Sequence, residues 1–145
     1  MPTLTLKSNR ERSLLRRHPW LFSGAIQSVE GDPVPGETVE VLSSRGEFLA
    51  RAAYSPQSQI SARVWSFDPD QKIDAELIRA RLLRAIDSRK PYRQFSNSLR
   101  LVHAESDGLP GLIVDQYDET LTIQFLSAGA EFWRETITEL LVEIT

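Results

Sequence analysis

Short strand-like runs, several of which alternate apolar and polar residues, dominate the first 67 residues, and this pattern most narrows the folds open to the chain. The runs occupy residues 3–7, 38–42, 48–54 and 60–67, with turn residues between them. Alternation with a period of two is typical of strands that bury one face. Several short strands with regular turns and one small helix predict a compact β-barrel.

The one helix predicted in this half follows the first strand. Ser8 and Glu11 have the spacing of a capping box, with Ser8 as the N-cap. Leu14 and Leu15 would then face the core. The helix should end near His18, because the proline that follows disfavours helical geometry in the residue before it.

A different pattern begins at residues 68–70, where Asp-Pro-Asp marks a turn. Residues 73–89 repeat apolar positions with helical spacing, and Asp74 stands where an N-cap is expected. Ile78, Leu82 and Ile86 form the stripe that would face a core. This segment therefore predicts an amphipathic helix.

Strands are predicted again over residues 99–103, 112–116 and 120–126, the last two as a hairpin. A second amphipathic helix is predicted over residues 130–145. We expect a mainly β domain over 1–67 and a small α+β domain of helix, β-hairpin and helix over 68–145. The apolar side of the last helix would consist of Trp133, Ile137, Leu140, Leu141 and Ile144.

Composition excludes several kinds of site. The 145 residues contain no cysteine, which rules out disulfides, thiolate metal sites and cysteine nucleophiles within them. No apolar run reaches roughly 18 residues, and the charged start lacks the apolar centre of a signal peptide. We therefore expect a cytoplasmic protein with no membrane partner.

The net charge of −3 does not indicate a nucleic-acid binder, but the charges are unevenly distributed. Residues 7–17 hold five basic residues and one acidic residue. Fields are local, since salt screens exposed charges over about 10 Å, so such a patch can bind phosphates on an acidic chain. The alternative is a solvated helix face, and charge alone favours that alternative.

No group of residues predicts a catalytic, cofactor-binding or metal site. His103, Glu105 and Asp107 lie close in sequence, which would suit acid–base or metal chemistry. However, residues 105–111 contain two glycines and a proline, as a tight turn requires, and we interpret the segment as structural. Two histidines without a paired spacing make a transition-metal site improbable.

Cations and aromatic rings alternate in the segment that starts at Lys7 and runs through His18 to Phe22. Cations contact phosphates and aromatic rings stack on bases, so this combination suits RNA. Arg63 and Trp65 share one side of a predicted strand and would extend the surface. The alternative is that the aromatic residues are core, which we favour for Trp20.

Residues 16–26, with the sequence RRHPWLFSGAI, resemble the signature of a PUA domain. More narrowly, they resemble the 5-methylcytosine methyltransferases of large-subunit ribosomal RNA, closest to the bacterial ribosomal RNA large subunit methyltransferase I group. The same resemblance extends over residues 49–60, 62–68, 105–111 and 126–131. It therefore covers nearly the whole chain.

This resemblance implies a PUA-like RNA-binding domain, a central domain and an S-adenosylmethionine domain, the last of which we expect to be absent from this chain. The chain alone would then be non-catalytic and hold no cofactor, whereas the full-length protein would use S-adenosylmethionine. Its partner would be structured large-subunit ribosomal RNA. The resemblance places RNA contacts on the first helix and the strand beside it, at Lys7, Arg10, Arg16, Arg17, His18, Arg51, Tyr54, Gln59 and Arg63.

Two other functions stay open at this point. One is a PUA-like module for protein interaction or dimerisation, with a homodimer as the expected assembly. The other is a small hydrolase that uses His103, Glu105, Asp107 and Asp115, which we consider the weaker hypothesis.

Overall fold

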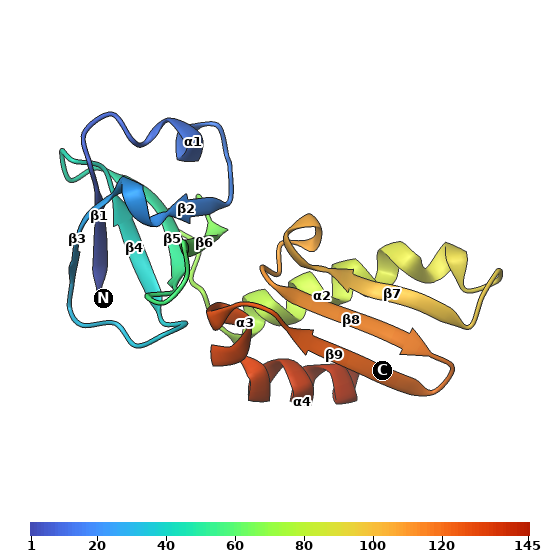
Figure 1. Ribbon diagram of the computed structural model, residues 1–145. Coiled ribbons are helices and arrows are strands. Elements are labelled where there is room, and N and C mark those ends of the chain that lie inside the picture. Colours follow the sequence, from blue (N-terminus) through green and yellow to red (C-terminus); the bar gives the residue numbers. More distant parts are fainter. The chain divides into compact units, whose positions relative to one another are not determined.

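The computed structural model describes residues 1–145, which divide into two compact units, Met1–Ile73 and Asp74–Thr145 (Figure 1). The segment 68–73 is predicted to open the second domain, but in the structure it belongs to the first unit. Arg51 Nη1 holds it by donating to the carbonyls of Pro69 (2.8 Å) and Gln71 (2.7 Å).

The first unit is built on one six-stranded sheet with the order β2-β6-β5-β4-β1-β3. β1 and β4 are parallel, and the other neighbouring strands are antiparallel. The sheet curls into half of a barrel, which confirms the predicted fold class. The strands are β1 (Thr3–Leu6), β2 (Trp20–Phe22), β3 (Ile26–Glu30), β4 (Thr38–Leu42), β5 (Phe48–Tyr54) and β6 (Ile60–Ser66), and the short helix η1 (Ser23–Ala25) joins the edge strands β2 and β3.

The core of this unit lies inside the curl, because successive side chains of a strand point to opposite faces. Every second residue of β1 and β4 is fully buried there, as are Ala50 and Ala52 of β5. Leu14 of the short helix α1 (Arg12–Leu15) joins them, and α1 lies over one end of the curled sheet (Figure 1). The cluster consists of Leu4, Leu6, Leu14, Leu21, Val39, Val41, Ala50, Ala52, Ala62 and Val64.

The predicted capping box is wrong. Asn9 adopts a left-handed conformation with φ 67°, so the chain turns at residues 8–9 and the helix starts only at Arg12. Its N-cap residue is Glu11, and no side chain caps it. A helix of one turn presents a single residue to the core, so Leu14 is buried whereas Leu15 is 67% exposed instead of inward.

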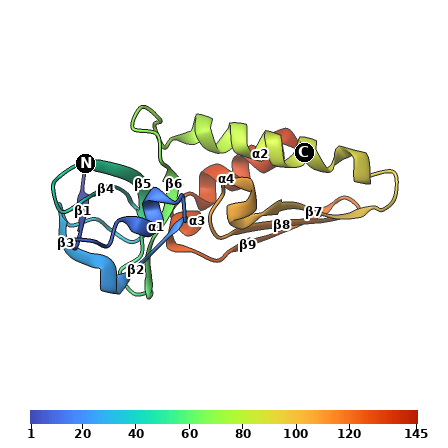
Figure 2. The same ribbon diagram turned by 90° about the horizontal axis from the view of Figure 1, so that it is seen from above.

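The second unit has two layers. Its antiparallel sheet has the order β7-β8-β9, and helices cover one face of it (Figure 2). Its elements are α2 (Ala75–Arg89), η2 (Lys90–Tyr92), β7 (Ser98–His103), η3 (Ala104–Asp107), β8 (Leu112–Tyr117), β9 (Thr120–Phe125), α3 (Ala128–Phe132) and α4 (Arg134–Ile144).

The predicted elements of this unit are mostly confirmed. The Asp74 carboxylate accepts the N–H of Leu77 at 3.0 Å and caps α2, and Ile78, Leu82 and Ile86 are buried. The predicted C-terminal helix is instead two helices. They meet at Trp133, whose φ of −96° and ψ of 13° depart from helical values.

Residues 105–111 form the tight turn predicted from their glycines. Gly108 ends η3 with φ 70°, and Gly111 has φ 75°. A side chain at Gly111 would lie against Ser127, the N-cap of α3, which accepts the N–H of Ala130. Both glycines therefore occupy left-handed backbone positions that favour glycine, and the missing side chain of Gly111 also lets Ser127 pack closely against the turn.

We predict that Gly111→Ala destabilises the second unit more than Gly108→Ala. The added Cβ would lie 2.8 Å from the Ser127 nitrogen, whereas at Gly108 it meets only the end of the Arg81 side chain. Left-handed geometry alone costs about 1–2 kcal/mol, and overpacking adds about 1–3 kcal/mol at Gly111. Chemical denaturation measures both variants, and equal losses would contradict the close packing of Gly111 on Ser127.

Candidate nucleic-acid interface

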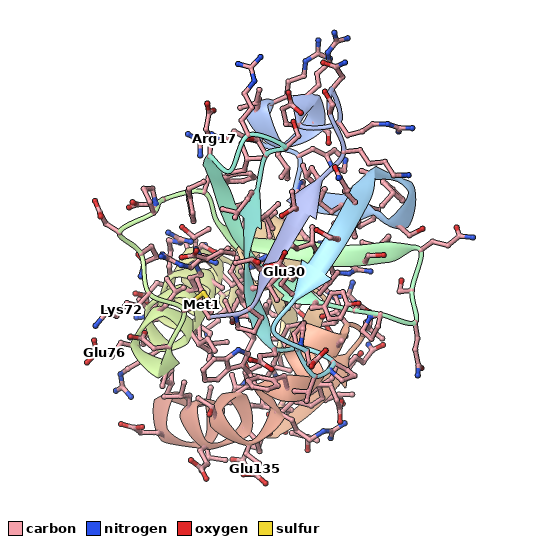
Figure 3. The ribbon with its side chains drawn as sticks, turned by 90° about the vertical axis from the view of Figure 1, so that its left-hand side faces the viewer. Met1, Arg17, Glu30, Lys72, Glu76 and Glu135 are labelled. Carbon is pink, nitrogen blue, oxygen red and sulfur yellow. The ribbon has the colours of Figure 1, made fainter.

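A basic groove lies beside α1 on the surface of the first unit. It has a volume of about 570 Å³, and no carboxylate lines it. None of its three arginines forms an ion pair with an acidic residue. Figure 3 shows the side chain of Arg17 at the same end of the unit as α1. The groove is lined by Arg12, Ser13, Arg16, Arg17, His18 and Pro19.

The groove forms because the chain reverses immediately after α1. The N–H of Arg17 donates to Leu14 O at 2.9 Å, and the N–H of His18 donates to Ser13 O at 2.9 Å. Arg17 adopts φ 65°, a conformation that few non-glycine residues take. Its guanidinium lies 4.9 Å from the centre of the Phe67 ring, a cation–π contact. These bonds place three cations around one concave surface.

A row of aromatic rings continues from the groove along β2. The His18 and Trp20 ring centres are 6.0 Å apart, those of Trp20 and Phe22 are 6.5 Å apart, and both pairs meet edge to face. The guanidinium of Arg63, the neighbour of Trp20 on β6, lies 5.0 Å from the Trp20 ring centre. His18 Nδ1 accepts the N–H of Trp20 at 3.2 Å, which leaves Nε2 as the donor nitrogen.

Trp20 is therefore not a core residue, contrary to the prediction. The alternation of β2 places Leu21 inside, with 1% of its surface exposed, and Trp20 and Phe22 on the opposite face. Phe22 is 51% exposed and Trp20 is half-buried. Trp65, which was expected to extend the surface, is buried.

Three more of the predicted residues are exposed on the first unit. Lys7 and Arg10 are exposed in the turn before α1, where the Arg10 N–H donates to Lys7 O at 3.1 Å. Gln59 is exposed at the start of β6, and its carbonyl accepts the N–H of Ser23 at 2.8 Å. This bond places Gln59 next to the end of β2.

Two of the residues predicted to contact RNA make contacts within the fold of the first unit. The guanidinium of Arg51 bonds to two carbonyls and pairs with Glu40 at 3.3 Å, and it lies over the Phe48 ring. Tyr54 packs against the barrel core. The Arg51 guanidinium serves the fold of the first unit and Tyr54 is partly buried against its core, and the RNA contacts expected of these two residues stay a prediction.

Two residues of this surface were absent from the predicted contacts. Arg12 lines the groove, and Phe22 ends the aromatic row. Both lie in the cationic and aromatic segment that the sequence singles out. Phe22 could have been identified from the period of two that it shares with Trp20.

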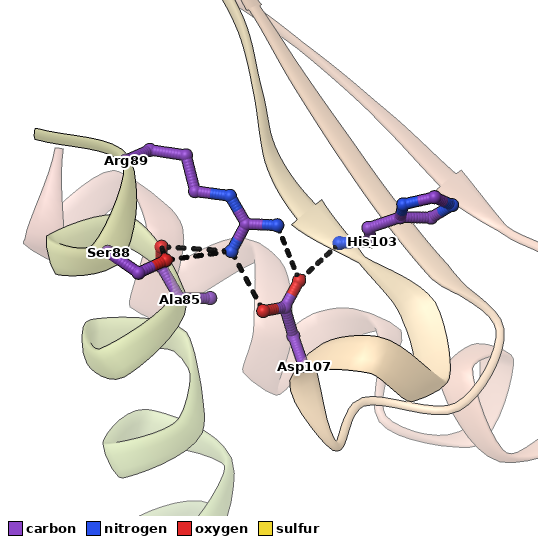
Figure 4. A network of polar contacts seen from close by, with 5 residues as sticks. All are labelled: Ala85, Ser88, Arg89, His103 and Asp107. Carbon is purple, nitrogen blue, oxygen red and sulfur yellow. Dashed lines mark hydrogen bonds and ion pairs between the residues drawn. The ribbon is translucent and has the colours of Figure 1, made fainter. Parts of the chain in front are cut away.

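Asp107 of the second unit takes part in a network of polar contacts that serves its fold (Figure 4). Both Asp107 oxygens accept from Arg89, at 2.8 and 2.9 Å, and one also accepts the His103 N–H at 2.6 Å. Burial raises the pKa of Asp107, but the bonds from Arg89 and His103 outweigh it, so that the pKa is lower than usual. A carboxylate held in this way is not poised as a general base.

The other carboxylates of the hydrolase hypothesis are also engaged. Glu105 accepts the N–H of Gly111 at 2.9 Å, and Asp115 accepts two bonds from Arg100. The structure contains no group of three or more histidine, aspartate and glutamate side chains that could hold a metal ion. None of the helices combines the length and the apolar composition that a bilayer crossing requires.

The two units do not fit an S-adenosylmethionine site of the nucleotide-binding type. Such a site needs a parallel strand, a glycine-rich loop and a helix whose N-terminus faces the ligand. The sheet of the second unit is antiparallel, and β9 leads into a five-residue helix capped by the Ser127 side chain.

Residues 4–67 match the family model described as a PUA-like domain. The chain is 52% identical over 140 residues to the ribosomal RNA large subunit methyltransferase I of Yersinia pseudotuberculosis and to that of Yersinia pestis. The alignment covers 95% of this chain and 35% of each relative, so the chain spans about a third of their length.

Solved structures share the fold at low sequence identity. A protein described as a SAM-dependent methyltransferase from Streptococcus mutans has a TM-score of 0.84 and 18% identity, and the match covers 99% of this chain and 38% of that one. A second protein, described as a methyltransferase and solved in complex with SAH, has a TM-score of 0.83 and 18% identity, over 37% of its length. At this identity the likeness shows the fold alone.

We predict that Asp107→Asn lowers stability at neutral pH but leaves RNA affinity within about twofold, since Asp107 lies outside the basic groove. Loss of the charged bonds to Arg89 should cost about 1.5–3 kcal/mol. The folded pKa is lower than the ordinary value of 3.8, so the ionised form stabilises the fold above that value. The difference between wild type and variant should therefore shrink as the pH falls below 3.8.

Asp118→Asn is the matched control, because Asp118 is exposed in a left-handed turn that asparagine also tolerates. Denaturation curves at neutral and acidic pH measure both variants. A loss for Asp107→Asn no larger than that for the control would contradict the structural role.

Proposed function

We propose that this chain, with its PUA-like domain and its 52% identity to ribosomal RNA large subunit methyltransferase I, docks large-subunit ribosomal RNA for a cytosine-C5 methyltransferase. The observation that carries the proposal is the basic groove of the first unit, with three arginines and a histidine and without a carboxylate. In this proposal the chain is an RNA-targeting region and not itself the catalyst. A ribosomal RNA partner would place its action in the cytoplasm.

The chemistry of the groove suits phosphates. Guanidinium groups bind phosphate oxygens in a two-pronged geometry and stay charged at any physiological pH. An arginine that forms no ion pair keeps its donors available and sacrifices no protein contact when RNA arrives. The groove arginines meet this condition, whereas Arg51 does not.

Phosphate contacts fix the position of the RNA but carry no base information. We assign this positioning role to the exposed cations of the first unit. The half-buried Arg63 and the exposed Gln59 flank the aromatic row and would contact the part of the RNA that passes over β2. The proposed RNA contacts are Lys7, Arg10, Arg12, Arg16, Arg17, His18, Gln59 and Arg63.

Methyl transfer is assigned to protein outside these 145 residues. The relatives are about three times as long as the matched segment, which leaves room for a cofactor domain. S-adenosylmethionine would supply the methyl group there. The homodimer expected from the sequence remains a prediction, and sedimentation of the purified chain measures it.

We predict that the double variant Arg16→Ala, Arg17→Ala binds a ribosomal RNA hairpin more weakly and with a flatter salt dependence. Each phosphate contact releases counterions, so two lost contacts should lower the slope of log affinity against log salt by about two units. The loss should be similar for hairpins of different sequence. Filter binding over a series of salt concentrations measures the slope.

The control is the double variant Lys72→Ala, Arg84→Ala, which removes the same charge from exposed positions outside the groove. It should keep nearly the wild-type slope. Equal slopes for wild type and the folded groove variant would remove the groove from the RNA-binding surface.

We also predict that the chain does not bind S-adenosylmethionine, because neither unit has a strand, glycine-rich loop and helix to hold it. Isothermal titration calorimetry of the purified chain should show no binding heat. Micromolar affinity at one site per chain would contradict the assignment of the cofactor to another part of the protein.

A further inference from the structure

Phe22 is more exposed than Trp20, its neighbour in the aromatic row, and it does not belong to the core cluster. It is 51% exposed on the outer face of β2, an edge strand of the half-barrel. Single exposed apolar side chains are common on protein surfaces, so what indicates a partner is the position of this ring in a row that joins the basic groove. The phosphate contacts proposed for the basic groove do not use this ring.

The strand geometry keeps the Phe22 ring on the outer face. Leu21 is fixed in the core, so its neighbours on both sides must point outward. The Trp20 ring meets the Phe22 ring edge to face, with planes 77° apart. Trp20 is in turn packed against His18 and the Arg63 guanidinium. The Phe22 ring therefore contacts the Trp20 ring on one side and is open to solvent elsewhere.

The row is continuous with the groove, because His18 belongs to both. An RNA backbone that lies in the groove would therefore bring its next nucleotides toward Phe22. Gln59 is held beside this position, since its carbonyl accepts the N–H of Ser23, the residue after Phe22. Its side-chain amide offers one acceptor and two donors, which suit the edge of a base.

This arrangement distinguishes between paired and unpaired RNA. A base within a helix is already stacked on both faces, so it has no face free for a protein ring. An unpaired base can stack on an aromatic side chain and expose its edge to hydrogen bonding. An exposed aromatic ring next to a cationic groove is the combination used by proteins that bind single strands.

We propose that Phe22 is a stacking platform for an unpaired base of the docked RNA, with Gln59 bonding to the base edge. The substrate class is therefore structured RNA that carries an unpaired nucleotide next to a helix, not a fully paired hairpin. This inference rests on the proposed RNA-docking function. Trp20 is a positioning residue that holds the Phe22 ring and does not itself stack on the base.

The test compares two RNAs with equal numbers of phosphates. One is a blunt hairpin, and the other is a shorter hairpin with a single-stranded extension that contains 2-aminopurine. The wild-type chain should bind the extended RNA more tightly and quench the 2-aminopurine fluorescence. Phe22→Leu should weaken binding of the extended RNA by about 5- to 150-fold and abolish the quenching, since stacking contributes about 1–3 kcal/mol.

Two variants separate stacking from other causes. Phe22→Tyr retains the ring and should keep the affinity and the quenching. Leu15→Ala removes an apolar side chain that is 67% exposed on α1 and should change neither RNA's affinity. Phe22→Leu should bind the blunt hairpin within about twofold of wild type, because that RNA offers no free base.

The outcomes are distinguishable. Unchanged affinity of Phe22→Leu for the extended RNA, or an equal loss for both RNAs, would overturn the stacking platform while the groove proposal stands. Tight binding of both RNAs without a preference would do the same, because it would assign the exposed ring to another partner. Failure of wild type to bind either RNA would instead overturn the docking function, and the platform with it.

Discussion

Burial of two leucines fixes the whole candidate interface. Leu14 is the only residue of α1 in the core, and Leu21 is the only residue of β2 there. Each contributes about 1.5–3 kcal/mol by leaving water, and each forces its neighbours in sequence to the surface. The neighbours of Leu14 include the groove arginines, and the neighbours of Leu21 are the aromatic rings. The same burial that folds the half-barrel therefore displays the cations and the rings.

The sequence predicts strands well where the period of two is undisturbed, as in β1 and β4. It misses β3, because Ile26 and Val29 both face the core although they are three residues apart. A bulge between the partners of Thr5 and Leu6 shifts the register and hides the alternation. It also misses β2, whose three residues are all apolar and so carry no visible alternation.

The sequence predicts the parts of the candidate site whose residues are neighbours in the chain, and it misses the parts that depend on distant partners. The residues close together in sequence, from Arg16 to His18, lie together in space because one chain reversal joins them. The role of Arg51 depends on Glu40 and on carbonyls 18 and 20 residues away, and such partners leave no local pattern. The apolar run around Trp20 predicts a core residue. Its exposure follows from strand alternation, which can be recognised only once Leu21 is known to lie in the core.

The most direct test of the interface is an NMR titration of the isotope-labelled chain with a ribosomal RNA hairpin that carries an unpaired extension. The account predicts that the largest amide shift changes fall on residues 12–22 and on Gln59. Residues around Arg89 and Asp107 should change little. Changes concentrated in the second unit, or on β3 at the other edge of the sheet, would contradict the assignment of RNA docking to the groove and the aromatic row.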